Sequence, residues 1–243
     1  MSNAPLLWIT GASSGIGQAV AAEFLRQGWR VAGSARTVAG LPPGCLAVPV
    51  DVTDGPALAD TLERLEAEHG PIDLAILNAG THQPTSALAL EPAVFRRLFD
   101  VNVMGTVNAL APVLGRMVAR GRGQVAIVAS VAGYSGLPQA AAYGATKAAL
   151  INMAEALRIE LAGTGVDLRL ICPGFVRTPL TDRNEFPMPF RIEAEDAARR
   201  IYRGLVHGRR FELDFPRRFT LMLKLLRLLP YALYLPLVRR MTR

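Results

Sequence analysis

Hydrophobic positions along the chain alternate between short apolar runs and longer stretches with a helical repeat. The apolar runs lie at residues 6–10, 30–35, 46–50, 73–78, 124–130 and 167–172. Between them, apolar side chains recur three and four positions apart at 17–28, 56–69, 94–117 and 143–161, which predicts helices. The third of these should break or bend near Gly105 and Pro112. Because nearly every position of the runs is apolar, the strands should be buried on both faces. The pattern therefore predicts an α/β fold with a doubly wound, mostly parallel sheet.

The first strand leads directly into a glycine-rich turn, Thr10-Gly-Ala-Ser-Ser-Gly-Ile-Gly17. Glycine allows a tight turn and a close approach of the backbone to a ligand. The N-terminus of the next helix offers free N–H groups and a positive dipole, which favour phosphate. Glycine-rich turns also occur without a ligand, but dinucleotide sites use this placement between strand and helix. The turn is therefore a candidate phosphate-binding loop.

The second strand ends without an acidic residue, and Arg36 follows it. In dinucleotide folds, an acid about 20 positions after the glycine turn binds the ribose hydroxyls and selects NAD. A guanidinium in that place suits the 2′-phosphate of NADP. The alternative is a plain surface arginine in a chain that contains 25 of them. We expect NADP, with NAD as the less favoured cofactor.

Tyr143 and Lys147 lie four residues apart at the start of the last predicted helix, and therefore on one face of it. A free tyrosine has a pKa of about 10, too high for ready proton exchange at neutral pH. A nearby ammonium favours the phenolate, so we expect Lys147 to lower the pKa of Tyr143. Only two of the 27 basic residues are lysine, which argues against Lys147 as a generic surface cation. The pair is a candidate proton-transfer site.

Together with polar residues at other strand ends, these motifs resemble the short-chain dehydrogenase/reductase family. The matching segments, in the order of the family, are Thr10–Gly17, Asp51-Val52, Asn78-Ala79-Gly80, Asn102, Ser130, Tyr143-x-x-x-Lys147 and Pro173-Gly174. The resemblance implies a single-domain Rossmann-type fold of about seven strands, with residues 211–215 as the last strand. It also implies hydride transfer between a nicotinamide and a carbonyl or alcohol carbon.

The resemblance also implies a role for each site residue. Tyr143 would exchange the oxygen-bound proton, and Lys147 would lower its pKa and hold the nicotinamide ribose. Ser130 would bind the substrate oxygen, and Asn102 would position a water in a proton relay. The residues expected to line the cofactor are Gly11, Ser13, Ser14, Gly15, Ile16, Gly17, Arg36, Asp51, Val52, Asn78, Ala79, Gly80, Tyr143, Lys147, Pro173, Gly174, Val176 and Thr178. Some relatives that use NADP carry a basic residue where this chain has Ser14, so Arg36 alone supports NADP. A regulator that binds the nucleotide without turnover is the alternative, but it has no chemical need for all four candidate catalytic residues.

The composition suits one α/β domain over residues 1–216 with a helical extension over residues 217–243, since 51% of the 243 residues are hydrophobic. Cys45 and Cys172 have no C-x-x-C spacing, and no apolar leader begins the chain. We therefore expect a cytoplasmic protein. Three scattered histidines indicate no metal site. We expect a homodimer or homotetramer.

The net charge of +7 comes from the carboxyl-terminal segment. Residues 217–243 contain seven basic residues and no acid, so the remainder of the chain is neutral. No nucleic-acid-binding motif accompanies this charge, and we expect no nucleic-acid partner. Residues 220–229 predict a leucine-rich helix that ends at Pro230, and Pro236 should interrupt the next apolar stretch. The helix has about half of the roughly 20 residues that a membrane span needs.

This segment has three open roles: packing on its own domain or a second subunit, an apolar flap over the substrate, and peripheral contact with a membrane. Residues 178–193 are a candidate lid, with Phe186, Met188 and Phe190 among prolines. These three side chains either pack on the body or face an apolar substrate. The expected substrate is a small carbonyl compound or secondary alcohol of lipophilic character.

Overall fold

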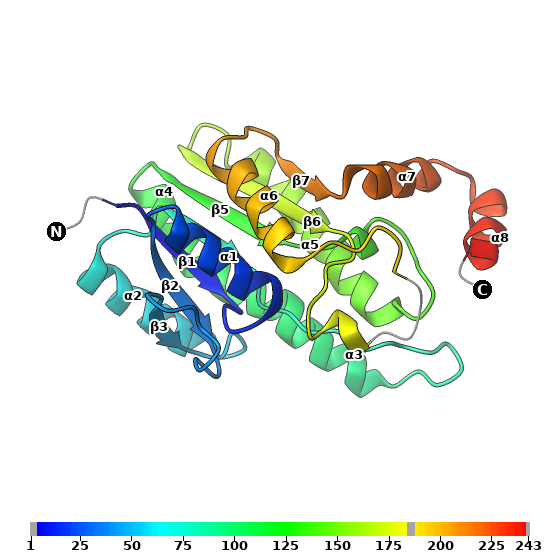
Figure 1. The fold of residues 1–243 in the computed structure, drawn as a ribbon, viewed down its shortest axis with the longest axis horizontal. Coiled ribbons are helices and arrows are strands. Elements are labelled where there is room, and N and C mark those ends of the chain that lie inside the picture. Colours follow the sequence, from blue (N-terminus) through cyan, green and yellow to red (C-terminus); the bar gives the residue numbers. More distant parts are fainter. Residues whose placement is uncertain (1–3, 184–187, 242–243) are drawn as a thin grey trace.

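Seven parallel strands form one sheet in the computed structural model, which describes residues 4–183 and 188–241 (Figure 1). The order across the sheet is β3-β2-β1-β4-β5-β6-β7, and every neighbouring pair is parallel. The strands are β1 (Leu6–Thr10), β2 (Arg30–Ala35), β3 (Leu46–Pro49), β4 (Leu74–Leu77), β5 (Gly123–Val128), β6 (Val166–Pro173) and β7 (Glu212–Phe215). The predicted fold class is confirmed. The strand order reverses between β1 and β4, where open α/β sheets form a binding crevice.

Helices cover both faces of the sheet. They are α1 (Gly15–Arg26), α2 (Gly55–His69), α3 (Pro92–Phe99), α4 (Gly105–Ala119), α5 (Ala141–Glu160), α6 (Ala194–Val206), α7 (Arg217–Arg227) and α8 (Tyr231–Met241). α1 and α6 pack together on one face, whereas α2, α4 and α5 cover the other (Figure 1). Successive side chains of a strand point to opposite faces. Leu7 of β1 therefore packs with α1 and α6, and Trp8 packs with the helices of the other face.

The helical stretch predicted at residues 94–117 contains the expected break near Gly105, and the break is a π-helical turn. A π-helical turn, Asp100–Met104, separates α3 from α4 immediately before Gly105. Pro112, in contrast, lies inside α4 and does not end it. The stretch Pro92–Ala119 is long and apolar enough to span a membrane, with a mean hydropathy of 1.3. Side chains such as Met117 nevertheless belong to the main core, as in the core helix of a globular domain.

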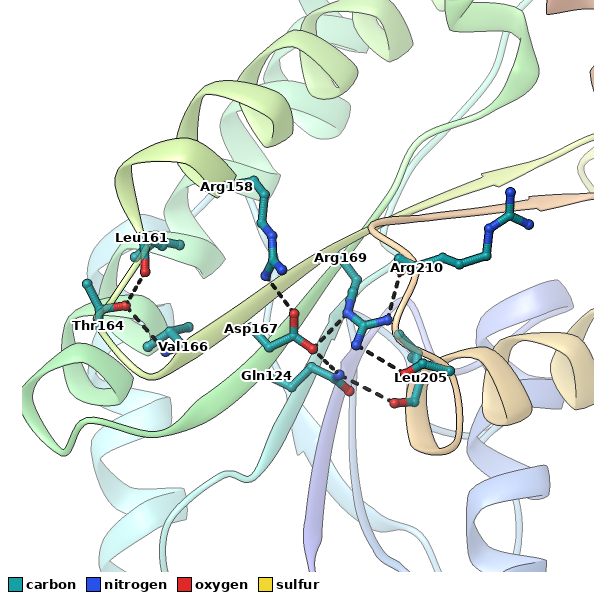
Figure 2. Close-up of polar contacts among 10 residues, drawn as sticks. Gln124, Arg158, Leu161, Thr164, Val166, Asp167, Arg169, Leu205 and Arg210 are labelled. Atoms are coloured by element: carbon teal, nitrogen blue, oxygen red, sulfur yellow. Dashed lines mark hydrogen bonds and ion pairs between the residues drawn. The ribbon is translucent and has the colours of Figure 1, made fainter.

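The amino-terminal ends of β5 and β6 are tied to the helices by a network around Asp167 (Figure 2). Its carboxylate accepts hydrogen bonds from Arg158 Nη1 at 2.6 Å, from Arg169 Nε at 2.7 Å and from Gln124 Nε2 at 2.8 Å. Burial raises the pKa of Asp167, but the hydrogen bonds and the two guanidinium charges outweigh it and lower the pKa. Arg169 also donates to the carbonyl oxygen of Arg210. This network fixes the amino-terminal ends of β5 and β6. The candidate site lies at the opposite, carboxyl-terminal ends of the strands.

The carboxyl-terminal segment forms α7 and α8, which extend beyond β7 at one end of the molecule (Figure 1). Pro230 separates the two helices, as predicted. The prediction that Pro236 interrupts the second one is wrong, because α8 runs from Tyr231 through Met241. Pro236 lies in the second turn of α8, so the helix loses one backbone hydrogen bond there and continues.

α7 contributes to the packing of the main body. Phe219 and Leu223 are buried in the same cluster as side chains of α5 and β6. The Phe219 ring lies 5.5 Å from the Phe175 ring and 5.9 Å from the Phe190 ring, between centroids. The tail thereby contacts the candidate lid, in which Phe186 lies outside the described residues. The expected domain boundary after residue 216 stays a prediction.

The tail contains no acid, but acids from outside it balance the charge of Lys224. Its Nζ lies 2.5 Å from Glu212 Oε2 and 3.1 Å from Asp214 Oδ2, both in β7. These acids precede residue 217, so a charge count restricted to the tail does not include them. The turn at Pro216 brings β7 and α7 together and creates the ion pairs.

Candidate functional site

The glycine-rich turn connects β1 to the N-terminus of α1. Gly11 and Gly15 have φ values of 67° and 55°, which strain residues with a Cβ. At Gly17, an added Cβ would lie 2.2 Å from the Gly11 carbonyl oxygen and 2.4 Å from Asn78 Nδ2. Ser14, which precedes α1, makes no side-chain cap, and the first turn of α1 holds no acid. This backbone cradle and uncapped helix end fit the phosphates of a dinucleotide.

Asn78 and Ala79, which follow β4, are held against this turn by Thr10. The Thr10 hydroxyl accepts hydrogen bonds from the backbone N–H groups of Asn78 and Ala79, both at 3.0 Å. In return, Asn78 Nδ2 donates to the carbonyl oxygens of Thr10 at 3.1 Å and Gly11 at 3.2 Å. Asn78-Ala79-Gly80 and the glycine turn therefore form one continuous wall at the point where the strand order reverses.

The segment after β6 covers the other side of the turn. A Cβ at Gly15 would lie 3.2 Å from Thr178 Cβ, which places Thr178 over the turn. Thr181 fixes this segment, because its hydroxyl lies 3.2 Å from the Thr178 hydroxyl and donates to the Val176 carbonyl at 2.7 Å. The hydroxyl group of Thr178 is therefore positioned to bind a phosphate that lies on the glycine turn.

Three expected cofactor residues contribute their side chains mainly to packing. Val176 is buried on the α1–α6 face, and Ile16 packs against the same cluster. Val52 is buried on the opposite face, and its carbonyl oxygen accepts a hydrogen bond from Asn108 Nδ2 at 3.0 Å. A cofactor role for these residues rests on their backbone atoms and stays a prediction.

Arg36 follows β2 and is exposed to solvent. The pKa of Asp51 is lowered, chiefly by the hydrogen bond from the Thr53 N–H and in part by the charge of Arg36, so Arg36 and Asp51 are neighbours. The loop after Arg36 folds back onto the glycine turn, where a Cβ at Gly40 would lie 2.1 Å from the Ser13 carbonyl oxygen. Arg36 therefore lies beside the glycine turn, near the carboxyl ends of β1, β2 and β3.

Ser130, Tyr143 and Lys147 lie together near the carboxyl ends of β5 and β6. Lys147 Nζ is 5.7 Å from the centroid of the Tyr143 ring, one turn away on α5. Ser130 precedes a short 3₁₀ turn, Val131–Gly133, and its hydroxyl accepts from the Ala132 N–H at 3.2 Å. The same hydroxyl also forms a polar contact with Tyr143 that lowers the tyrosine pKa. The structure thus brings three of the four candidate catalytic side chains into one site.

Pro173 and Gly174 connect this site to the tail. The Ser130 hydroxyl lies 3.5 Å from the Pro173 carbonyl oxygen. A Cβ at Gly174 would lie 3.0 Å from a ring carbon of Phe219, so α7 packs directly against this motif. Phe219 therefore supports the strand end that carries the expected cofactor contact.

Lys147 is buried, with 4% of its surface exposed. Its Nζ donates to the Val128 carbonyl oxygen at 2.9 Å, and no carboxylate in the described chain lowers the cost of burying its charge. Burial lowers the pKa of Lys147 to about 8. A Cβ at Gly80 would lie 3.6 Å from Nζ, so glycine at this position leaves space beside the ammonium.

The expectation that Lys147 lowers the pKa of Tyr143 is wrong for this structure. Burial raises the pKa of Tyr143 to about 12, and the contact with Ser130 only partly opposes the rise. The reason is geometric, since the ammonium is directed at the Val128 carbonyl and not at the phenol. Tyr143 is therefore fully protonated at neutral pH.

Asn102 lies in the π-helical turn and is completely buried. Its Oδ1 accepts from the Thr81 N–H at 2.7 Å, and its Nδ2 donates to the Thr81 carbonyl at 2.9 Å and to Thr146 Oγ1 at 3.0 Å. The Thr146 hydroxyl donates to the Tyr143 carbonyl at 2.7 Å. Asn102 thus joins the strand end at β4 to the helix that carries Tyr143. The expected role in positioning a water stays a prediction.

Four residues outside the predicted set complete the site: Thr10, Thr81, His82 and Thr146. Thr10 and Thr146 lie within recognised motifs, so their position in the sequence was a usable signal. Thr81 follows the Asn78–Gly80 segment directly. His82 has no such signal, yet its ring packs edge-on against the Tyr143 ring at 4.7 Å, and burial lowers its pKa.

The fold and this site define an α/β dinucleotide-binding protein with a buried, protonated tyrosine beside the cofactor cradle. A family model described as short chain dehydrogenase matches residues 6–187. An uncharacterized oxidoreductase of Myxococcus xanthus is 39% identical over 96% of each chain. Oxidoreductase UcpA of Escherichia coli is 33% identical over 72% of this chain and 70% of its own. A solved short chain dehydrogenase from Burkholderia cenocepacia in complex with NADP is 26% identical, with a TM-score of 0.85 over 96% of this chain and 97% of that chain.

The chain belongs to the short-chain dehydrogenase/reductase family. It is an oxidoreductase of that family, whose nicotinamide cofactor fits the glycine cradle described above.

Proposed function

We propose that the protein is an NADP(H)-dependent oxidoreductase that interconverts a lipophilic carbonyl compound and the corresponding secondary alcohol. The observation that carries this proposal is the position of Tyr143, Ser130 and Lys147 beside the glycine cradle. The first two offer hydroxyl groups to one small region, and the third offers an ammonium with no carboxylate partner in the described chain. This set matches the needs of proton transfer to a substrate oxygen.

When bound, the reduced nicotinamide supplies the hydride that adds to the carbonyl carbon. Tyr143 donates its phenolic proton to the carbonyl oxygen as the π electron pair moves onto that oxygen, and the product is the alcohol. Ser130 donates a hydrogen bond to the same oxygen and stabilises the developing negative charge. Lys147, whose ammonium has no carboxylate partner in the described chain, would donate hydrogen bonds to the ribose hydroxyls of the nicotinamide and hold it in place. Tyr143 then regains its proton from solvent.

Carbonyl reduction and alcohol oxidation require opposite protonation states of Tyr143. A pKa of about 12 keeps the phenol protonated, which is the form that carbonyl reduction requires. Alcohol oxidation requires the phenolate, and this form becomes more populated as the pH rises. We therefore expect oxidation to gain relative to reduction in alkaline solution.

Arg36 supports NADP over NAD. It is an exposed guanidinium beside the glycine turn, next to Asp51 and after a strand that ends without an acid. A phosphate on the adenosine ribose would form a charge-assisted hydrogen bond with this group. The Burkholderia cenocepacia relative, which was solved as a complex with NADP, agrees with this choice.

Aromatic side chains at the substrate end support a lipophilic substrate. Phe175, Phe190 and Phe219 form a row, with successive ring centroids 5.5 and 5.9 Å apart through Phe219. Phe190 is exposed. This row borders the segment between the cofactor motif Pro173-Gly174 and α7, so a substrate with an apolar group would find aromatic contacts there.

The central test is Tyr143→Phe, which keeps the ring and removes the transferable proton. With NADPH and a panel of ketones and aldehydes of increasing chain length, kcat should fall by about 10²–10⁴-fold. The dissociation constant for NADPH, measured by fluorescence, should change little. Tyr231→Phe, at an exposed tyrosine, is the matched control. Near-normal turnover by Tyr143→Phe, or no turnover by the unmodified protein on any member of the panel, contradicts the proposal.

The cofactor test is Arg36→Ala. Loss of a charge-assisted hydrogen bond should weaken NADPH binding by about 1.5–3 kcal/mol and leave NADH binding nearly unchanged. Arg64→Ala removes an exposed arginine of α2 and serves as the control for net charge. Equal weakening of both cofactors would show that Arg36 is structural and that the choice of NADP is wrong.

A further inference from the structure

Exposed apolar side chains gather on the two carboxyl-terminal helices. Of the fifteen large apolar residues that are exposed in the described chain, eight lie within residues 217–241. They are Leu221, Leu225, Leu228, Tyr231, Leu233, Leu235, Leu237 and Met241. Leu228 and Tyr231, at the corner between α7 and α8, are 79% and 80% exposed. Exposed apolar side chains concentrated on two neighbouring helices indicate a contact with another molecule or with a membrane.

Five arginines lie on the same two helices as these apolar side chains. Arg217 and Arg218 begin α7, Arg227 ends it, and Arg239 and Arg240 lie in the last turn of α8. All five are exposed, and none forms an ion pair within residues 4–183 and 188–241. Residues 217–241 contain no acid, and the charge of Lys224 is already balanced by β7. We call the eight apolar residues and these five arginines the tail surface.

The inner sides of the same helices are fixed to the body. Phe219 and Leu223 of α7 lie in the main core. In α8, Tyr234 and Val238 are buried, and the Tyr234 hydroxyl donates to the Gly136 carbonyl at 2.6 Å. The tail surface is therefore the outer side of two helices that are already packed on the body of the protein.

We propose that the tail surface docks on an anionic lipid membrane, with the leucines in the interface and the arginines among the head groups. Each helix has 11 residues, which is about half of a membrane span, so the helices would lie in the plane of the interface. Five cations without an acidic partner in the described chain, on the same two helices as the exposed apolar side chains, match the charge of an anionic leaflet. In an isologous contact between two copies, the same cations would face each other with no acid in this segment to compensate.

This docking position places the membrane next to the substrate end of the site. Gly136, the acceptor for Tyr234, belongs to the loop between Ser130 and Tyr143. Phe190 and Phe219 connect the lid segment to α7. An apolar molecule in the outer part of the bilayer would therefore enter close to the candidate catalytic residues, although membrane binding itself does not depend on the proposed activity.

The test is co-sedimentation of the full-length protein with lipid vesicles. One set of vesicles is phosphatidylcholine, and the other contains about 30% phosphatidylglycerol. We expect binding to the anionic vesicles at about 0.02 M salt, strongly reduced at about 0.5 M because screening weakens the head-group contacts. Binding to phosphatidylcholine alone should be at least about tenfold weaker.

Two variants separate the apolar and charged contributions. The combined change Leu228→Ser, Leu233→Ser and Leu235→Ser should weaken binding by about tenfold or more. Its control is Leu88→Ser, Leu90→Ser and Ile159→Ser, at exposed apolar residues outside the tail. Arg227→Gln, Arg239→Gln and Arg240→Gln should weaken binding to anionic vesicles by about 10- to 100-fold. The matching control for charge is Arg64→Gln, Arg122→Gln and Arg203→Gln, at exposed arginines elsewhere.

Three outcomes of these experiments would overturn the proposal. Absence of the protein from every vesicle pellet, salt-independent binding to both lipids, or equal effects of test and control variants would each do so. Sedimentation velocity identifies the main competing role. If the leucine variant dissociates a larger assembly while vesicles bind neither form, the tail surface joins copies of the chain. Because the arginine variant leaves every apolar contact intact, the test does not depend on the folding of the leucine variant.

Discussion

The two lysines of this chain lie in two regions that treat a positive charge in opposite ways. One lysine is buried without a carboxylate partner in the described chain, and the other is paired with two carboxylates. Lys147, in the candidate site, is buried with a single backbone carbonyl as its acceptor, and burial lowers its pKa to about 8. Lys224, in α7, is 37% exposed and lies between Glu212 and Asp214 of β7. Burial lowers the pKa of Lys224, but the two carboxylates outweigh it and raise the pKa.

The difference separates a cation that has no acidic partner in the described chain from one whose charge is balanced within the protein. A carboxylate beside Lys147 would occupy the ammonium that a ligand needs, so burying this charge without a partner is a cost that the site bears. Lys224 has the reverse arrangement, since its charge is fully used inside the protein. Its Nζ also lies 5.4 Å from the centroid of the Tyr134 ring, and Tyr134 in turn donates to Glu212. Lys224 therefore connects the tail to the loop that follows Ser130.

The largest expected difference between the two lysines is in turnover. Lys147→Met should lower kcat by about 10²–10³-fold, the usual loss when one preorganised donor of a charge-stabilising site is removed. Lys224→Met should leave kcat within about threefold, because that ammonium faces β7 and not the site. Steady-state kinetics with NADPH and one carbonyl substrate compares the two variants directly. Equal losses in both would remove the distinction between a functional and a structural lysine.

The next difference is in titration, and two lysines give two resolvable NMR signals from ¹³C-labelled lysine. Lys147 should titrate near pH 8, and Lys224 above the 10.5 of a free lysine. Each Met variant assigns one signal by its disappearance. If both signals titrate together above pH 10, the buried lysine has a counter-charge that the structure does not show.

The same shift predicts how stability depends on pH. Lys147 has a pKa of about 8 when folded and about 10.5 when unfolded, so the unfolded chain binds more protons between these values. The free energy of unfolding should therefore rise with pH in this window, relative to Lys147→Met. Between pH 8 and pH 10 the rise is on the order of 2–3 kcal/mol. Tyr143 contributes in the opposite direction, but only above its unfolded pKa of 10. Urea titrations of both proteins at several pH values measure the difference, and parallel pH profiles would contradict it.

The smallest expected effect is the loss of the Lys224 ion pairs. Lys224→Met leaves Glu212 and Asp214 close together without a cation, which should cost about 1–2 kcal/mol of unfolding free energy after allowance for solvent screening. Lys224→Arg should recover part of the loss. Arg227→Met removes an exposed cation of the same helix and should change stability by less than about 0.5 kcal/mol. A loss that is equally large for Arg227→Met would point to general charge effects in the tail.

Local patterns were sufficient to predict most of the architecture and to indicate several residues that lie together at the strand ends. Short apolar runs, helical spacing and the glycine turn predicted the parallel sheet and the cradle, because each depends on residues that are close in sequence. The four-residue spacing of Tyr143 and Lys147 likewise placed both on one helix face. Motif order then brought Ser130 and Asn102 into the same site. Arg36 at the end of β2 was visible in the same way, although its cofactor preference is a proposal.

What the sequence alone determined is thus the order of elements, the residues at the strand ends and the excess of cations in the tail. The tertiary structure decided which groups those charges meet. It directed Lys147 to the Val128 carbonyl and so reversed the expected pKa shift of Tyr143. It also paired Lys224 with β7 and left five tail arginines exposed. Electrostatic energies depend on burial and on distances between atoms, and these are set only when segments far apart in the chain pack together.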